Sequence, residues 1–315
     1  ALSRVSYPGP MIVLLILGCT GSDPSDSFDS SSSTDPIVYD ESFRSRLPLV
    51  RVDTRDVQVD DDELWDDDGR AWTTVDATFI DTDIQGWAQW TAEPAFDGQA
   101  GMHIRGNSSA GYEKKSYALE TRDDNDEDMD VSLLGLPEEE DWILHGPFSD
   151  KTLMRNVLMY DWSREIGRYA SRVRFIELFV EDGGDSLGEE DYRGVYVLME
   201  KIKRESTRVD ITELESSDES EPEITGGYLM KKDWVDGDSL ETRIYDDVLL
   251  LVDPDPSEIT DVQRAWLEDW LHEFETVLAS DEFDDPETGY AAYIDVDSFV
   301  DHMLLVELGR NVDGY

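Results

Sequence analysis

Basic and small polar residues gather in one short stretch of a chain that is otherwise strongly acidic. The stretch reads Arg105-Gly-Asn-Ser-Ser109 and is followed by Lys114 and Lys115. Its glycine and the small side chains of Asn107 and Ser108 allow backbone amides to approach a ligand, while the arginine and the lysines supply positive charge. A phosphate-binding turn between two strands needs these residue types. The spacing is not that of a P-loop, so the stretch taken alone favours a structural turn.

Cys19 is the only cysteine of the chain, so it cannot form an internal disulfide. It ends the run Met11-Ile-Val-Leu-Leu-Ile-Leu-Gly-Cys19, which is shorter than the ~20 apolar residues that span a bilayer but as long as a signal-peptide core. Ile16-Leu-Gly-Cys19 resembles a bacterial lipobox, in which the cysteine is lipidated. We therefore expect residues 1–18 to be a signal peptide, with a start upstream of Ala1, and Cys19 to carry the lipid. A plain signal peptide with an incidental cysteine is the alternative.

Serine and aspartate dominate residues 19–46, which contain few apolar side chains. This composition is typical of a flexible tether. A tether directly behind a lipidated cysteine holds a folded domain away from the membrane. We therefore expect an extracytoplasmic, membrane-anchored lipoprotein of the bacterial cell envelope, whose contact with the membrane is the Cys19 anchor only.

The net charge excludes some partners. The 315 residues include 75 acidic and 26 basic ones, a formal charge of −49, while 39% hydrophobic and 10% aromatic residues suffice for a packed core. A surface this negative repels nucleic acid, so we expect no nucleic-acid partner. The acidic runs 66–69 and 123–130 lack the spacing of a calcium loop and are interpreted as solvated loops. The four histidines show no zinc spacing, and we interpret His145, which precedes Gly-Pro, as structural.

Hydrophobic periodicity predicts an α+β protein in which strands come first and helices last. Alternating apolar residues indicate a half-buried antiparallel sheet, and apolar residues at helical spacing indicate three helices. The predicted strands are 49–52, 72–80, 102–104, 115–121, 173–180, 192–199 and 226–230, and the predicted helices are 152–166, 258–278 and 295–308. The order predicts a sheet-rich N-terminal lobe followed by a helical lobe.

Five motifs in the same order resemble the CotH family of atypical kinases, which is named for a spore-coat protein. They are Arg105-Gly-Asn-Ser-Ser109 with Lys114-Lys-Ser-Tyr117, Leu133-Leu-Gly-Leu-Pro137 with Asp141-Trp142, Ser149-Asp-Lys151 with Arg155-Asn156, Arg193-Gly-Val-Tyr196 with Glu200-Lys201, and Asn311-Val-Asp-Gly-Tyr315. The resemblance covers residues 47–315. It implies a divergent protein-kinase-like fold and phosphoryl transfer from ATP with a divalent metal, Mg²⁺ or Mn²⁺.

The resemblance also implies roles for single residues. Lys115 or Lys114 would contact the nucleotide phosphates, with Arg105 and the Asn107-Ser108 turn beside them. Glu200 would pair with that lysine, as a helix glutamate does in ordinary kinases, although its sequence context suggests a strand end.

The last of the five motifs matches the catalytic loop of the family. By this resemblance Asp313 would be the base or a metal ligand, and Asn311 its partner on the metal side. Without the resemblance, Asn311 to Gly314 is an ordinary turn after a helix.

One departure from the family pattern bears on activity. Family members carry a Trp-Asp-x-Asp metal-binding segment some two dozen residues after the last motif, whereas this sequence ends at Tyr315. We therefore expect a C-terminally truncated domain with little or no kinase activity, because the metal neutralises charge during phosphoryl transfer. The complete domain is expected to transfer the ATP γ-phosphate to Ser or Thr of extracytoplasmic proteins. The alternative is a non-catalytic cell-surface, coat or adhesion module on the same fold.

Overall fold

A computed structural model of the chain describes residues 13–16, 43–57, 59, 65–66, 69–183, 187–233, 239–245, 248–312 and 314. The chain divides into two compact units. The barrel unit comprises Cys19–Asp161 and Ser171–Lys201, and the sheet–helix unit comprises Ala1–Gly18, Trp162–Ala170 and Ile202–Tyr315.

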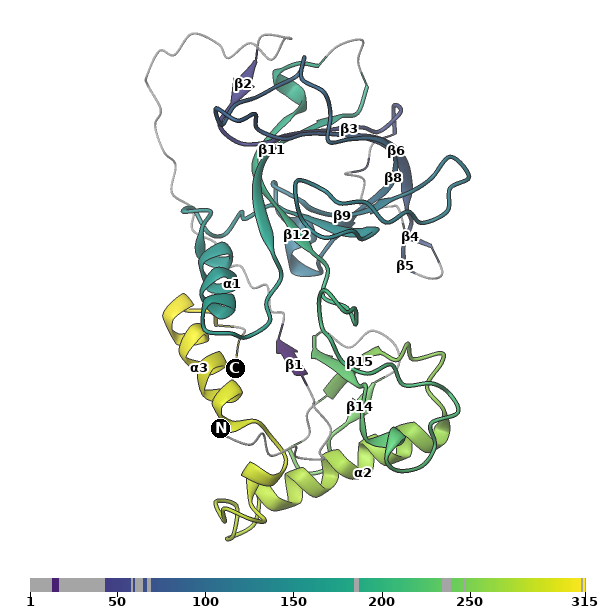
Figure 1. The fold of residues 1–315 in the computed structure, drawn as a ribbon, viewed down its shortest axis with the longest axis vertical. Helices are drawn as coiled ribbons and strands as arrows, with labels where there is room; N and C mark the ends of the chain where they lie inside the picture. Colours follow the sequence, from purple (N-terminus) through teal and green to yellow (C-terminus); the bar gives the residue numbers. More distant parts are fainter. Residues whose placement is uncertain are drawn as a thin grey trace. The chain divides into compact units, whose positions relative to one another are not determined.

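Seven strands of the barrel unit form a closed barrel (Figure 1). In the order in which they pair, they are β10 (Asp141–His145), β12 (Tyr192–Glu200), β11 (Val173–Glu181), β3 (Leu49–Asp53), β6 (Thr73–Ile80), β8 (Phe96–Arg105) and β9 (Ser116–Thr121). Pairing of β9 with β10 closes the barrel. Neighbouring strands are antiparallel except β3 and β11, which run parallel.

Alternation of side chains along the strands fills the barrel. In β6, Val75, Ala77 and Phe79 are fully buried, whereas Asp76 between them is exposed. Successive residues of a strand point to opposite faces, so each strand contributes every second side chain to one core. That core contains the buried aromatic residues Phe79, Phe96, Tyr117, Trp142 and Tyr196 together with aliphatic side chains from all seven strands.

Helix α1 (Arg155–Glu165) begins beside the barrel. Its residues Val157 and Tyr160 pack against Ile143, Val197 and Met199, which lie on the outer face of β10 and β12. Two short ribbons and two 3₁₀ turns complete the described part of the barrel unit. They are β2 (Arg44–Ser45) with β7 (Ala88–Gln89), β4 (Trp65–Asp66) with β5 (Gly69–Arg70), η1 (Ser108–Gly111) and η2 (Glu189–Asp191).

The sheet–helix unit contains a four-stranded sheet in the order β1 (Val13–Ile16), β13 (Leu229–Lys232), β15 (Val248–Asp253) and β14 (Leu240–Glu241). Helix α2 (Asp261–Leu278) lies along it in Figure 1 and buries Leu267 and Leu271 against the sheet. A capping box formed by Thr260 and Gln263 starts the helix, satisfying amides that lack a partner within it. The 3₁₀ turns η3 (Glu223–Thr225) and η4 (Tyr290–Ala292) also belong to this unit.

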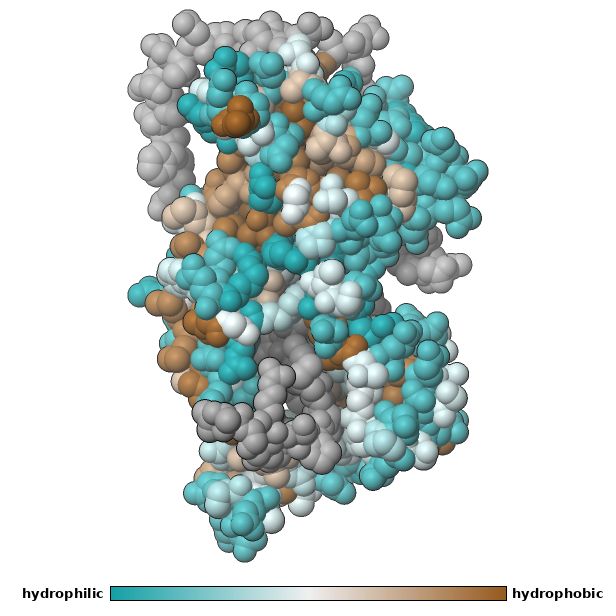
Figure 2. Space-filling model, in the orientation of Figure 1, coloured by the Kyte–Doolittle hydropathy of each residue, from teal (hydrophilic) through white to brown (hydrophobic). Residues whose placement is uncertain are grey.

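Helix α3 (Val296–Gly309) is capped by Asp295 and ends at Arg310, which has left-handed backbone angles. Arg168 holds it through ion pairs with Asp295 at 3.0 Å and Asp301 at 2.7 Å. The helix leaves apolar side chains exposed, and Figure 2 shows hydrophobic residues along it. These exposed residues are Phe299, Val300, Met303, Leu304 and Leu308.

The sequence predicted most of these elements. The predicted helices are confirmed as α1, α2 and α3, and the predicted strands coincide with β3, β6, β8, β9, β11, β12 and β13. The half-buried pattern of the sheet is confirmed by the alternating burial along β6, but the closure of the sheet into a barrel was not predicted. The expectation of a purely helical later part was wrong, because that part contains a sheet as well as helices. β10 and β15 were not predicted.

Two described strands overlap the predicted N-terminal segments. β1 lies within the predicted signal peptide, and β2 lies within the last residues of the predicted tether. Cys19 lies outside the described residues. Among the helices of the described chain, none is both long and apolar enough to cross a membrane.

Candidate functional site

Three basic residues predicted from the sequence come together where β8 and β9 meet. Arg105 ends β8 and is paired with Ser116, the first residue of β9, so Lys114 and Lys115 directly precede that pair. We call Arg105, Lys114 and Lys115 the basic corner. The hairpin places their backbones close together because antiparallel neighbours oppose each other residue by residue.

The Lys114 side chain is held by a motif far away in the sequence. Its Nζ donates to the Val195 carbonyl oxygen at 2.7 Å and lies 4.5 Å from the centre of the Tyr196 ring. Gly194 has a φ of +93°, and a Cβ there would lie 3.1 Å from Nζ, so this position both needs a glycine and leaves room for the amine. The carbonyl takes one of the three ammonium donors. Burial lowers the pKa of Lys114, and the negative charge of Glu177 partly opposes this shift.

Lys115 is fixed by both its side chain and its backbone. Its Nζ donates to the Ala110 carbonyl oxygen at 2.5 Å, which ties it to the turn that follows Arg105. Its own carbonyl accepts a 2.8 Å hydrogen bond from the Tyr196 hydroxyl. The backbone of Gly146 fits closely against both lysines, because a Cβ there would meet the Lys115 oxygen at 2.5 Å and Lys114 Cγ at 3.1 Å.

The turn that follows Arg105 is compact and solvent-facing. Gly106 has a φ of +92°, and a side chain at this position would collide with Ser109 Oγ, so the chain requires glycine here. Asn107 and Ser108 are exposed at the start of the 3₁₀ turn η1. The Tyr112 ring after it stacks on Phe148, with ring centres 5.0 Å apart.

His145, which we interpreted as structural, lies at the same place. It is the last residue of β10, and its Nε2 lies 3.3 Å from Asn156 Nδ2 in α1. Burial, followed by the charges of Arg105 and Lys114, lowers the pKa of His145 to about 4, while Asp150 opposes this shift. The imidazole is therefore neutral at pH 7 in this structure.

Asp150 anchors the start of α1 next to this histidine. Its Oδ2 accepts from the Arg155 amide at 2.9 Å, and its Oδ1 accepts from the Thr152 amide at 3.0 Å and the Thr152 hydroxyl at 2.7 Å. Burial would raise the pKa of Asp150, but these hydrogen bonds outweigh burial and lower it. The Asp150 carboxylate therefore accepts its hydrogen bonds at the start of α1.

Glu200 pairs with an arginine, whereas the resemblance implied a lysine as its partner. It is fully buried at the end of β12, four residues beyond Tyr196, and its carboxylate is paired with Arg172. Arg172 Nη2 lies 2.6 Å from Oε1, and its backbone amide donates to Oε2 at 2.8 Å. The strand-end position suggested by the sequence is confirmed.

Asn311, which the resemblance assigns to the catalytic loop, lies in the sheet–helix unit. Asn311 follows α3, and its amide donates to the Val306 carbonyl at 3.0 Å. Gly314 packs against the Val306 side chain. Asp313 lies outside the described residues, as does the lipidation candidate Cys19.

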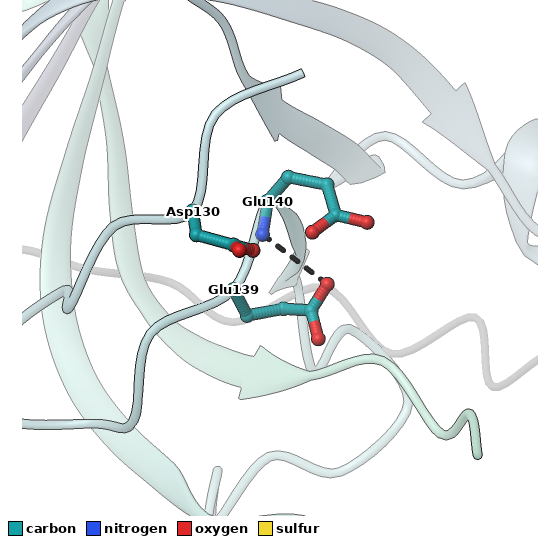
Figure 3. Close-up of side chains that lie close together, drawn as sticks. All are labelled: Asp130, Glu139 and Glu140. Carbon is teal, nitrogen blue, oxygen red and sulfur yellow. Dashed lines mark hydrogen bonds between the residues drawn. The ribbon is translucent and has the colours of Figure 1, made fainter. Parts of the chain in front are cut away.

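A separate group of carboxylates was not singled out from the sequence. Asp130, Glu139 and Glu140 each place one carboxylate oxygen within 4.8 Å of the others. Figure 3 shows these three side chains lying close together. Glu139 is buried and accepts from the Glu140 amide at 3.2 Å. Three oxygen ligands suit a hard cation, but exposed acidic groups are common without one, so we assign no metal here.

Comparison with known families adds one finding. A family model described as "CotH kinase protein" matches residues 102–315. The chain belongs to the CotH family. The CotH match begins in β8 and includes the basic corner, His145, Glu200 and the Asn311 loop. No curated protein sequence matches the chain.

The sequence indicated the three cations of the basic corner but not the residues that hold them. Gly194, Val195 and Tyr196 were noticed as a motif, yet only the closed barrel brings them to Lys114. His145 was visible in the sequence, but its neighbours became apparent only once β10 was placed beside β9 and β12.

Proposed function

We propose that the chain binds the phosphates of ATP at the basic corner, which is the binding step of phosphoryl transfer of the CotH type. The observation that carries this proposal is the arrangement around Lys114, where two CotH motifs from distant parts of the sequence meet. Three cations in one place create a positive potential in a partly buried site, which favours binding of an anion. The chain as a whole is strongly acidic, so a cluster of three basic residues is unusual in it.

The residues present suit a phosphate group. Arg105 offers a planar guanidinium and the lysines offer point charges, both of which form strong charge-assisted hydrogen bonds with phosphate oxygens. Glycine at positions 106 and 194 keeps side chains away from the turn and from the Lys114 amine. Burial disfavours the charged form of Lys114, and a bound anion would favour that form again.

We assign the remaining roles of a divergent kinase-like fold by family membership. ATP with Mg²⁺ or Mn²⁺ supplies the phosphoryl group and neutralises charge as it transfers. Lys114, Lys115 and Arg105 hold the phosphates. Asn311 and Asp313 are assigned to the metal and to orienting a Ser or Thr hydroxyl of an extracytoplasmic protein.

A comparison of ligand affinities tests whether the basic corner binds phosphates. The chain is titrated with ATP and Mg²⁺ by calorimetry, and the titration is repeated with ADP, inorganic tripolyphosphate and adenosine. Saturable binding of ATP and tripolyphosphate, with much weaker binding of adenosine, is expected because the corner contacts phosphates. Absence of ATP binding by folded protein at millimolar concentration would contradict the proposal and favour the non-catalytic surface module.

The proposed location is the outer surface of the cell membrane, with Cys19 as the lipid anchor. The apolar run followed by Gly18-Cys19 supports it. Expression in a bacterial host with radiolabelled palmitate is expected to label the protein, and Cys19→Ser is expected to remove the label. Equal labelling of both forms would contradict lipidation at this residue.

A further inference from the structure

His145 shares one row of the barrel with the basic corner. Arg105 of β8 is paired with Ser116 of β9, and His145 of β10 is paired with Val197 of β12. Leu144 of β10 is paired with Tyr117 of β9, so the adjacent residues His145 and Ser116 lie opposite each other in the same register. The amide of Gly146 also donates to Ser116 Oγ at 3.0 Å. Residues that oppose each other in antiparallel strands point to the same face. Arg105 and His145 therefore face the same side of the barrel.

The groups around the imidazole are mostly positive. Arg105 approaches from β8, Lys114 from the segment before β9, and Asp150 from the loop before α1. Helix α1 contributes the neutral Asn156, and β12 contributes the apolar Val197. Asp150 is already engaged by two backbone amides and a hydroxyl. Burial first, and then these positive charges, disfavour a proton on His145, so the ring is neutral.

Asn156 defines the hydrogen-bonding state of the ring. With the amide nitrogen of Asn156 donating, Nε2 of His145 is the acceptor, and the proton of the neutral ring is on Nδ1. Protonation at Nε2 becomes favourable once negative charge arrives, because the Asn156 amide can rotate to present its oxygen. A polyphosphate bound by Arg105 and Lys114 supplies that charge.

We propose that His145 is a phosphate-binding residue of the basic corner that takes up a proton when nucleotide binds. The inference rests on the proposed function, since it assumes phosphates at the corner. It makes nucleotide affinity depend on pH: wherever bound protein carries one more proton than free protein, affinity rises about tenfold for each unit of falling pH. The proton comes from solvent and returns to it on release.

NMR titration of the histidine rings tests proton uptake directly. The chain is titrated from pH 8 to 5 with and without saturating ATP and Mg²⁺, and the His145 signal is identified by its loss in His145→Gln. Without ATP, His145 is expected to stay neutral down to pH 5. With ATP, its midpoint is expected to move up by at least about one unit, into the titrated range.

Calorimetry in two buffers of different ionisation enthalpy gives the number of protons taken up. His272→Gln, a change in α2 of the other unit, is the matched control. Wild type and His272→Gln are expected to take up more protons at pH 5.5 than His145→Gln does; protonation of ATP itself is common to all three. Equal uptake, or an unshifted His145 midpoint with ATP bound, would overturn this inference and leave ATP binding intact. No ATP binding by wild type would instead overturn the proposed function.

Discussion

Lys114 illustrates how a single residue depends on neighbours that the sequence does not place beside it. Its amine lies against Gly194, the Val195 carbonyl and the Tyr196 ring, about 80 residues later in the chain. The hydrogen bond to a carbonyl and the cation–π contact hold the charge in a partly buried position. The sequence could not choose between Lys114 and Lys115, because that choice depends on which side of β9 each side chain leaves.

Gly194→Ala is predicted to weaken ATP binding by several-fold. The φ of +93° strains an alanine by about 1 kcal/mol, and its Cβ would crowd the Lys114 amine. Gly135→Ala is the matched control, because Gly135 has a φ of +79° but open space around it. Urea unfolding should show a similar loss of stability in both variants. Loss of ATP affinity in both, or in neither, would argue against the Lys114 arrangement.

At the scale of elements, the predictions succeeded where periodicity was long and failed where it was short. Helices α2 and α3 differ from their predicted bounds by only a few residues, because apolar residues repeat at helical spacing over several turns. β10 has five residues, three of them consecutively buried, so it shows no alternation to read. β8 extends six residues before its predicted start because glycines interrupt its pattern. Without β10 the sequence could not place His145 in the site.

Asp150→Ala is predicted to destabilise the protein by about 1–2 kcal/mol. The change leaves the Arg155 and Thr152 amides without their acceptor at the start of α1, and a lost helix-terminal acceptor typically costs this much. Asp124→Ala removes an exposed carboxylate from a loop of the same unit and is expected to change stability by less than about 0.5 kcal/mol. Urea denaturation compares the two, and equal stabilities would show that Asp150 does not anchor the helix.

At the scale of the whole molecule, the net charge opposes folding while the buried core favours it. The formal charge of −49 makes the surface repulsive to itself, yet the barrel unit retains a fully packed core. Composition predicted that a core exists but not that the sheet closes. Closure depends on the pairing of β9 with β10, which joins strands about 25 residues apart across a loop rich in acidic residues.

Salt is predicted to stabilise the protein. Raising sodium chloride from 10 mM to 0.5 M shortens the screening length to a few ångströms, so the repulsion among 75 acidic residues weakens. The melting temperature should rise by on the order of 5 °C, measured by calorimetry at pH 7.5. Potassium chloride at the same concentrations should raise the melting temperature by a similar amount. An unchanged or lower melting temperature would show that ion pairs such as Arg168–Asp301 outweigh the repulsion.

The central claim is that the basic corner holds nucleotide phosphates through Lys114. Its most direct test is the affinity of the folded chain for ATP with Mg²⁺, compared between Lys114→Met and Lys201→Met. Lys201 directly follows the C-terminal end of β12 and pairs with Asp141 at 2.9 Å, away from the basic corner. Replacing either lysine by methionine removes one positive charge, so the two variants have the same net charge. We predict that Lys114→Met weakens binding by about 10- to 100-fold, the usual value of a charged hydrogen bond, and that Lys201→Met changes it by less than about twofold. Equal affinities of both variants and wild type would contradict the account.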